Sequence, residues 1–355
     1  MIRCAAFAQR VALPSNDEAD WVPPAVERTL QLIDSTGAHT ILSTSPPLAT
    51  HIVAWRVHRL RKVRWIADFR DPLAGNPFRR TDWFFNWDRF AENQIFREAD
   101  AFIANTDGLG QLWMKNHPER GADINIIWNG FAPEERLTAF PPSTRSRRVI
   151  AHVGTFYQGR HPGGLLTALD RLIRGGRLDP AGIVFEQTGW VDPSSIEPYR
   201  EVADRLAQLG CYRASAERIP KDEADKRMAA ADYLLLADLN EAGQSIQVPA
   251  KIFDYLCAER PVIAFTDSGS PTRRILEQSG VESLFSFPET PPAEFDASLL
   301  RFLDPGPRTS RPNAWFWETF DGERQTAKLA RILRGERITE SPYQRSPQAQ
   351  VPATP

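Results

Sequence analysis

Short apolar runs alternate with amphipathic stretches along most of the chain, a pattern typical of buried parallel strands joined by helices. The clearest example is residues 248–265, VPAKIFDYLCAERPVIAF. Its apolar residues between positions 252 and 257 share one helix face, while Lys251, Asp254 and Tyr255 interleave with them as polar positions. Pro261 ends the helix, and four apolar residues follow. The pattern therefore predicts a helix that leads into a buried strand.

This alternation occurs twice, and it predicts two successive α/β halves. In the first half we expect strands at 40–43, 64–67, 101–104 and 124–128, with helices at 26–33, 48–61, 88–98 and 108–116. In the second half we expect strands at 149–153, 182–187, 216–219, 233–237 and 262–265, with helices at 165–173, 196–209, 222–230 and 271–279. A last helix is expected at 324–334. The predicted class is α/β, with two doubly wound domains.

A polar, proline-containing segment at 133–146 separates the two halves and predicts the domain boundary. We expect a first domain at 1–145, a second at 146–310, a C-terminal helical segment at 311–335, and a disordered tail at 336–355. In open parallel sheets, ligands bind beyond the carboxyl ends of the strands. We therefore expect the site where those ends meet polar loops.

Composition narrows the class of protein. The 355 residues carry a net charge of −2, which gives no electrostatic argument for nucleic-acid binding. Three widely separated cysteines show no metal-ligand spacing and fit a reducing cytoplasm. No apolar run reaches the length of a membrane span. We expect a cytoplasmic protein.

The helix expected before Pro261 also carries candidate chemistry. A lysine ammonium and backbone amides can bind phosphate oxygens, and a carboxylate one turn later can accept hydrogen bonds from ribose hydroxyls. Lys251 and Asp254 have this spacing. An ordinary surface Lys–Asp pair on an α/β helix has the same spacing, so both interpretations stay open on the residues alone.

Three stretches resemble the family-four-like glycosyltransferases, and they lie in the order expected for that family. They are HTILSTSPPLATHIVAWRVHRLRKVRWIADFRDP, HVGTFYQGRHPGGLLTAL and VPAKIFDYLCAERPVIAF. The resemblance implies a GT-B fold, in which two Rossmann-like domains face a cleft. It also implies that the acceptor is bound mainly by the first domain and a nucleotide-sugar donor mainly by the second, as a co-substrate. Transfer would retain the anomeric configuration, with no cofactor and no obligatory metal.

The resemblance assigns roles in the second half. Gly154 matches a glycine where the donor approaches the backbone, and Arg160 stands where the family usually has a lysine that contacts the diphosphate. Thr155 replaces a basic residue that often follows the glycine. Lys251 is expected to supply this second cation.

The family's paired acids are not both present. Asp254 matches the second acid, which binds ribose, but the position of the first acid is Ile246. Glu241 is the nearest upstream acid and is the candidate for that role.

In the first half, Asp68, Arg70 and Asp71 follow a strand. A carboxylate there can bind an acceptor hydroxyl or help to deprotonate it, whereas an ordinary role is a local Arg–Asp pair that fixes a loop. Ser43 and Ser45, with the hydroxyl between them, are candidates to bind acceptor or phosphate, or to cap the next helix.

Two further expectations concern the first half. A basic cluster near Trp55 and Trp65 predicts a peripheral contact with an anionic membrane at its inner face, or simply a solvated helix face. Its members are Arg56, Arg59, Arg61, Lys62 and Arg64. The resemblance also implies that the N-terminal strand and glycine-rich loop of the family are shortened, so the first domain would be incomplete.

The resemblance implies transfer of a hexosyl or other glycosyl group from a nucleoside-diphosphate sugar to a saccharide or lipid-linked acceptor, in bacterial surface polysaccharide or glycoconjugate biosynthesis. The catalytic candidates are Asp68, Asp71, Arg160 and Lys251. Two alternatives stay open: a sugar-nucleotide epimerase on the same fold, and a catalytically inactive saccharide-binding or scaffold protein.

Overall fold

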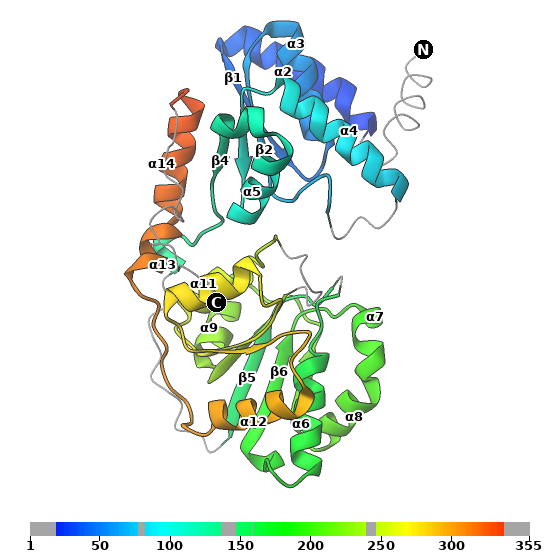
Figure 1. Cartoon of the computed structure of the whole chain (residues 1–355), viewed down its shortest axis with the longest axis vertical. Coiled ribbons are helices and arrows are strands. Elements are labelled where there is room, and N and C mark those ends of the chain that lie inside the picture. The colour runs from blue at the N-terminus through cyan, green and yellow to red at the C-terminus, as the bar shows by residue number, and fades with distance from the viewer. Residues whose placement is uncertain (1–18, 77–81, 136–146, 158, 239–245, 337–355) are drawn as a thin grey trace, which may run out of the picture. The chain divides into compact units, whose positions relative to one another are not determined.

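The chain forms two compact units, each with its own parallel sheet (Figure 1). The computed structural model describes residues 19–76, 82–135, 147–157, 159–238 and 246–336. Of these described residues, the first unit contains those at 19–128 and 324–336, and the second contains those at 129–323. This division falls earlier than the boundary predicted at residue 145, and it places residues 324–336 in the first unit. The predicted tail at 337–355 lies outside the described residues.

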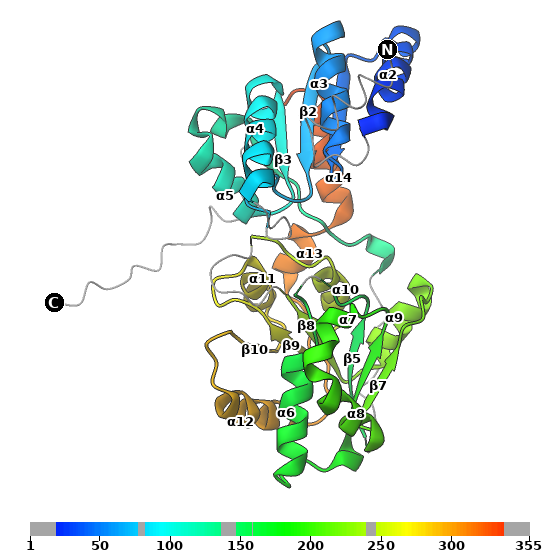
Figure 2. The same cartoon turned by 90° about the vertical axis from the view of Figure 1, so that its right-hand side faces the viewer.

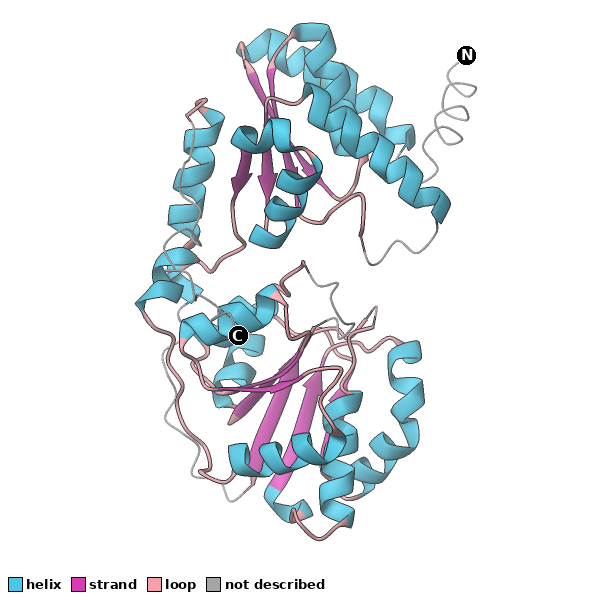
Figure 3. Cartoon of the chain, in the orientation of Figure 1, coloured by secondary structure: helices cyan, strands magenta, loops and turns pink. Residues whose placement is uncertain are grey.

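The first unit has a four-stranded parallel sheet in the order β1-β2-β3-β4 (Figure 3), and its strands lie at the apolar runs that predicted them. Its strands are Thr40–Ser45 (β1), Arg64–Phe69 (β2), Ala101–Ala104 (β3) and Ile124–Ile126 (β4). Its helices are Val22–Thr36 (α2), Ala49–Arg61 (α3), Asp82–Glu98 (α4) and Asp107–Asn116 (α5). The 3₁₀ turns η1 and η2 span Ala19–Trp21 and Pro118–Asp123.

The last helix, Gly322–Leu333 (α14), packs on the first sheet although it follows the second unit in sequence. Its Ile332 is buried in one cluster with Ile66 of β2 and Ile103 of β3. Arg64 donates from its guanidinium to the carbonyls of Ile332 and Leu333, where backbone acceptors at a helix end lack partners within the helix. α14 therefore completes the first unit, instead of forming the separate segment expected at 311–335.

The second unit has a six-stranded parallel sheet in the order β10-β9-β8-β5-β6-β7. Its strands are Arg148–Val153 (β5), Ile183–Thr188 (β6), Tyr212–Ser215 (β7), Tyr233–Ala237 (β8), Val262–Phe265 (β9) and Ser283–Ser286 (β10). Its helices are Gly163–Arg174 (α6), Pro193–Ile196 (α7), Arg200–Gln208 (α8), Lys221–Ala230 (α9), Lys251–Cys257 (α10), Pro271–Ser279 (α11), Pro292–Leu303 (α12) and Ala314–Thr319 (α13). Figure 2 shows α6 in front of this sheet, where it packs against α8 and α12.

Three elements of the second unit differ from the predictions. Pro198 interrupts the helix expected at 196–209, which appears as α7, the 3₁₀ turn Glu197–Tyr199 (η5), and α8. The edge strand β7 lies at Tyr212–Ser215 instead of 216–219, because only Tyr212 of this strand is buried and the apolar signal is weak. β10 and α12 were not predicted from the apolar pattern.

The core of the second unit is formed by strands that are apolar on both faces and by one face of each helix. In α6, Leu165, Leu166 and Leu169 are fully buried, and each such leucine contributes roughly 1.5–3 kcal/mol to folding. This packing fixes the starts of the loops that follow β5, β8 and β9. No helix among the described residues combines the length and apolarity needed to cross a membrane.

Candidate functional site

The strongest concentration of predicted site residues is at the carboxyl end of β5. Gly154 ends this strand with φ of +133°, a backbone conformation that favours glycine. A Cβ on Gly154 would lie 1.8 Å from Lys251 Nζ, so the lysine side chain occupies the space directly beside the glycine. Gly189, with φ of +117°, packs its own backbone against Gly154, and its Cβ would be 2.6 Å from the Gly154 carbonyl oxygen. Sequence reasoning assigned Gly154 and missed Gly189.

Lys251 is the first residue of α10 and extends over the end of β5. Its surroundings lower its pKa below the usual value, mainly because the ammonium is buried. Asp254 opposes this shift, and the nearby positive charge of Arg160 adds to it. Arg160 and Lys251, which come from segments far apart in sequence, thus lie close enough to repel each other. An anion between them would relieve that repulsion.

Arg160 lies in the loop between β5 and α6, with only 11% of its side chain exposed. Its Nη2 lies 3.8 Å from Oδ1 of Asp238, a fully buried carboxylate that follows β8. Asp238 Oδ2 accepts a hydrogen bond of 2.6 Å from Thr272 Oγ1. The Arg160 guanidinium also lies over the ring of Tyr157, 5.6 Å from its centroid. Asp238 carries no motif in the sequence and was not predicted.

Asp254 lies one turn after Lys251 on α10, as predicted, and it is partly exposed. Its Oδ1 accepts a hydrogen bond of 2.9 Å from Lys221 Nζ of α9. Lys221 also binds Asp225 at 2.7 Å. Burial opposes the charge of Lys221, but its hydrogen bonds to Asp225 and Asp254 raise its pKa above the usual value. The ribose role of Asp254 stays a prediction.

Buried side chains lie behind Lys251, and one of them, Tyr255, was wrongly predicted to be at a polar position. Tyr255, expected among the polar positions of the helix, is fully buried, because α10 packs this side chain against the end of β5. Its hydroxyl lies 3.2 Å from His152 Nδ1 and accepts from the Val153 amide at 3.4 Å. Burial and then the charge of Lys251 lower the pKa of His152 to about 3, so this imidazole is neutral.

The other predicted site residues of the second unit are Thr155, Ile246 and Glu241. Thr155 is partly buried between Gly154 and the buried Phe156. Ile246 is partly buried, five residues before the first residue of α10. Glu241, the candidate for the missing acid, lies outside the described residues.

In the first unit, the carboxyl ends of β1 and β2 bring Asp68 and Thr44 together. These residues are paired in the sheet register, and Thr44 Oγ1 donates to Asp68 Oδ2 at 2.7 Å. Burial raises the pKa of Asp68 above its usual value, although Thr44 and Arg70 oppose the shift. Arg70 is exposed and Asp71 is partly buried. The backbone amide of Arg70 donates to the Ser45 carbonyl, and the Arg70 carbonyl accepts from Asn105 Nδ2.

Ser43 and Ser45 are placed differently from the prediction. Alternate residues of a strand point to opposite faces, so both serines point into the core while Thr44 points outward. Ser43 Oγ accepts from Trp65 Nε1 at 2.8 Å and lies 2.7 Å from His51 Nδ1. Ser45 is 1% exposed. Neither hydroxyl is presented to a ligand, and neither caps α3, whose N-cap has no side-chain hydrogen bond.

The basic cluster of α3 and β2 is divided among separate partners. Arg59 pairs with Glu98 at 3.1 Å, Arg61 pairs with Asp34 at 2.9 Å, and Arg64 binds the end of α14. Exposed pairs of this kind contribute little to stability. The predicted membrane contact is therefore not supported by a single continuous cationic patch, and it stays a prediction.

Neither a protein-family model nor a curated protein matches the sequence. Solved structures do match the fold. HepE of Anabaena, crystallised with UDP, has a TM-score of 0.66 and 15% identity, covering 88% of this chain and 82% of HepE. The chain has the GT-B glycosyltransferase fold. Further structures with this fold are the sucrose-phosphate synthase of Thermosynechococcus elongatus (TM-score 0.65, 14% identity, 88% and 77% covered) and the lipopolysaccharide outer core galactosyltransferase WaaB (0.59, 13%, 88% and 79%).

The GT-B fold confirms the predicted fold class of two Rossmann-like α/β domains. The matches cover most of both chains in each comparison, so the likeness is not limited to one of the two sheets. At this level of identity the likeness establishes the fold alone. Roles for Arg160, Lys251, Asp254 and Asp68 therefore rest on the contacts described above.

Proposed function

We propose that this GT-B protein is a glycosyltransferase that takes a sugar from a nucleoside-diphosphate sugar. The observation that carries the proposal is the convergence of Arg160 and Lys251 near the close-packed glycines Gly154 and Gly189. Two cations beside a side-chain-free backbone form a place where a diphosphate can approach closely and be neutralised. HepE has been crystallised with UDP, UDP-glucose, and UDP with glucose, which supports testing uridine nucleotides first.

Each group of the second unit then has a chemical role. Lys251 and Arg160 stabilise the negative charge that develops on the departing diphosphate. Asp254 accepts hydrogen bonds from the ribose hydroxyls, in exchange for its contact with Lys221. Buried, neutral His152 and Tyr255 support Lys251 from below without adding charge. No step in this scheme requires a metal or another cofactor.

The acceptor side of the proposal rests on Asp68. A carboxyl group with a raised pKa is closer to the range in which it exchanges protons with a hydroxyl. We propose that Asp68 binds or helps to deprotonate an acceptor hydroxyl, with Asp71 and Arg70 as neighbours on the same loop. The acceptor hydroxyl attacks from the face that the diphosphate leaves, so that the anomeric configuration is retained.

The proposed acceptor is a saccharide or a lipid-linked saccharide, in the assembly of bacterial surface polysaccharide. A lipid-linked acceptor would bring the protein to an anionic membrane, where Trp55, 5.1 Å below the Arg59 guanidinium, is a residue suited to the interface. Cosedimentation with phosphatidylglycerol vesicles tests this contact. Binding that is weakened by Arg56→Ala with Arg59→Ala supports the contact, and equal recovery with neutral vesicles argues against it.

The experiment for the overall proposal is incubation with a panel of UDP-, GDP- and ADP-sugars without an acceptor, followed by NMR of the products. A transferase is expected to release nucleoside diphosphate slowly by transfer to water, and the released sugar should first appear with the anomeric configuration of the donor. Release of an altered sugar would identify an epimerase instead. Absence of both binding and turnover across the panel would favour the inactive scaffold and contradict the proposal.

A further inference from the structure

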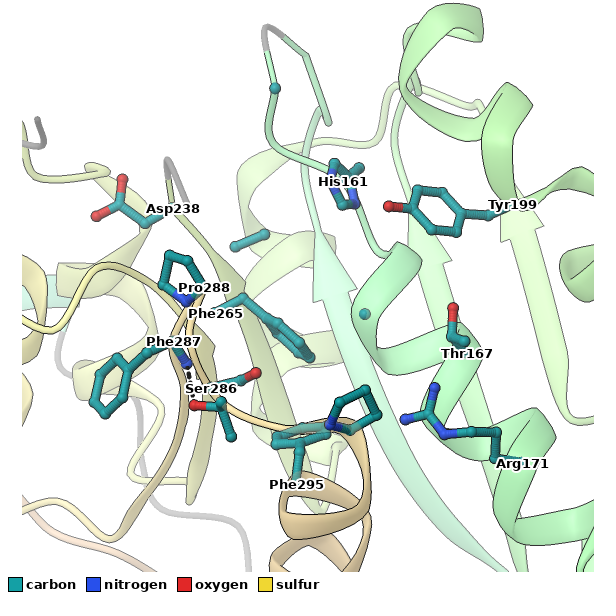
Figure 4. A pocket seen from close by; sticks show the side chains of 15 residues that line it. His161, Thr167, Arg171, Tyr199, Asp238, Phe265, Ser286, Phe287, Pro288 and Phe295 are labelled. Atoms are coloured by element: carbon teal, nitrogen blue, oxygen red, sulfur yellow. Dashed lines mark hydrogen bonds between the residues drawn. The ribbon is translucent and has the colours of Figure 1, made fainter. Parts of the chain in front are cut away.

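A cavity of the second unit, of about 550 Å³, lies between α6 and the segment that connects β10 to α12 (Figure 4). We call it the α6–α12 pocket and define it by His161, Thr167, Tyr199, Phe265, Ser286 and Phe295, which are among its lining residues. Gly154, Lys251 and Asp254 do not line it. The pocket therefore lies apart from Gly154, Lys251 and Asp254, although Asp238, which faces Arg160, is among its lining residues. The proposed function leaves the pocket unused.

One wall of the pocket is apolar and aromatic. Phe265 of β9 and Phe295 of α12 meet edge to face, with ring centroids 5.1 Å apart. Pro288 and Pro292 extend this wall. Figure 4 shows the two phenylalanines opposite Thr167 and Arg171 of α6. Aromatic rings give flat surfaces on which the C–H face of a sugar ring can pack, and they lose little side-chain freedom on binding.

The opposite wall offers hydrogen bonds in defined directions. The Gly163 amide donates to His161 Nδ1 at 3.2 Å, so the neutral imidazole carries its proton on Nε2, where it can donate. Burial lowers the pKa of His161, which favours this neutral form. The His161 ring contacts the Tyr199 ring at 4.9 Å. Thr167 Oγ1 donates to the Gly163 carbonyl at 2.6 Å and keeps lone pairs for a ligand hydroxyl.

Two successive glycines at the start of α6 leave the space that the rings of Tyr199 and Phe265 occupy. A Cβ on Gly163 would lie 2.2 Å from the Tyr199 ring, and a Cβ on Gly164 would lie 2.2 Å from the Phe265 ring. Both aromatic side chains are thus packed directly on the helix backbone, which fixes Tyr199 and Phe265 before any ligand binds. A preformed pocket of this kind binds a ligand without a large ordering cost.

The charges at the pocket are balanced within the protein. Arg171 binds Asp296 through Nε and Nη2 at 2.8 and 2.6 Å. Asp238 faces Arg160 and accepts from Thr272. With each cation opposite a carboxylate, the lining gives no net attraction for an anion, but it retains hydroxyl and imidazole groups next to aromatic faces. This combination fits a neutral, polyhydroxylated ligand better than a phosphate.

We propose that the α6–α12 pocket binds a neutral saccharide unit at a site separate from the nucleotide donor. The sugar ring packs on Phe265 and Phe295, while its hydroxyls bind His161, Tyr199 and Thr167. The volume accommodates one or two hexose rings. A free sugar and a residue of a longer glycan present the same chemistry, so both are used as probes.

The test is saturation-transfer NMR with glucose, galactose, N-acetylglucosamine and maltose, in the presence of excess UDP that occupies the donor site. We expect at least one of these probes to bind the wild type with an affinity in the millimolar range. Thr167→Trp, which fills the pocket, and Tyr199→Leu, which removes the hydroxyl and ring, should each weaken binding about tenfold or more. Arg174→Trp is the control, because Arg174 is on the same helix with 70% of its side chain exposed and does not line the pocket.

Separate outcomes overturn the pocket and the proposed function. The pocket assignment fails if none of the four sugars binds, if Thr167→Trp and Tyr199→Leu bind as well as Arg174→Trp, or if inorganic phosphate displaces the sugar. It also fails if Lys251→Ala, instead of the pocket variants, abolishes sugar binding. If Thr167→Trp does not fold, as judged by near-UV circular dichroism, Tyr199→Leu decides the outcome. UDP binding, measured in the same samples, reports on the donor site independently.

Discussion

The ammonium of Lys251 lies beside the backbone of Gly154, where a methyl group on the glycine would be 1.8 Å from Nζ. This contact joins the first residue of α10 to the residue that directly follows β5. Both segments were singled out in the sequence. The lysine is buried there next to a second cation, Arg160, which lowers its pKa. An arrangement that destabilises the empty site and suits an anion is characteristic of a binding site.

The first prediction concerns the cost of burying this lysine. Because the pKa of Lys251 is lower in the folded protein than in the unfolded chain, its charge destabilises the folded state at neutral pH. Lys251→Met should therefore raise the melting temperature of the ligand-free protein by a few degrees at pH 7. The gain should shrink as the pH rises toward the usual lysine pKa, where the wild-type side chain loses its charge in both states.

The control for this stability effect is Lys226→Met on α9, where the side chain is 64% exposed. It should leave the melting temperature nearly unchanged. A Lys251→Met variant that melts below the wild type at pH 7 would show that Lys251 stabilises the fold, contrary to a binding role that costs stability.

The second prediction concerns Gly154. Alanine at this position would have to adopt φ of +133° and would displace the end of Lys251. Gly154→Ala should lower the free energy of unfolding by about 1–3 kcal/mol, as measured by urea denaturation, and should weaken UDP binding. Gly182→Ala is the matched control, since Gly182 has no unusual φ and no neighbour near its Cβ position. Equal effects of the two substitutions would remove the special role of Gly154.

The third prediction separates ribose recognition from phosphate recognition. Asp254→Asn should weaken UDP binding about ten- to a hundredfold, as expected for the loss of hydrogen bonds to a charged group. Binding of inorganic pyrophosphate, which has no ribose, should stay within a factor of about two in isothermal titration. Asp222→Asn, an exposed acid on α9, serves as the control. If the variant loses pyrophosphate and UDP equally, Asp254 acts through Lys251 or Lys221 and not through ribose.

The fourth prediction is a loss of stability in acid caused by buried histidines. Burial lowers the pKa values of His51 and His152 to about 3, whereas histidine in the unfolded chain titrates near its usual pKa of 6.5. Between these values the unfolded chain binds protons that the folded protein excludes, so stability present above pH 6.5 falls as the pH falls. From pH 7 to pH 5 each histidine should account for a loss on the order of 2 kcal/mol.

Urea denaturation of the wild type and His51→Gln at both pH values measures this loss. The variant is less stable at pH 7, because Ser43 loses its imidazole partner, but its change in free energy between pH 7 and pH 5 should be smaller. An identical change in the two proteins would mean that folding does not lower the pKa of His51.

The sequence predicted the fold well because the buried strands are continuous apolar runs that have few other structural interpretations. Such runs occur at β2, β3, β5, β8 and β9. It failed where burial is weak or one-sided: β7 has one buried residue, and β10 is half-buried with serine at both ends. It also could not place α14 on the first sheet, because that contact joins residues far apart in the chain.

The sequence analysis assigned Gly154, Arg160 and Lys251 to one site, and the structure places Lys251 beside Gly154 and near Arg160, while their binding roles stay predictions. The roles of Ser43, Thr44 and Ser45 could not be predicted, because they depend on which face of the strand each side chain is on. Ser43 and Ser45 point into the core, and Thr44 between them donates to Asp68. Tyr255 was misplaced because a tyrosine hydroxyl can be satisfied inside the protein, here next to His152. Asp238 gave no signal, since a single buried carboxylate after a strand belongs to no motif.

The central claim is that Arg160 and Lys251 together hold a nucleoside diphosphate. The most direct measurement is isothermal titration of UDP, GDP and ADP into the wild type, Arg160→Ala, Lys251→Ala and the exposed control Lys226→Ala at low ionic strength. We predict that at least one nucleotide binds the wild type and Lys226→Ala equally, and binds each of the other two variants about tenfold or more weakly. Equal affinity in all four proteins, or no binding to the wild type by any of the three nucleotides, would contradict the claim.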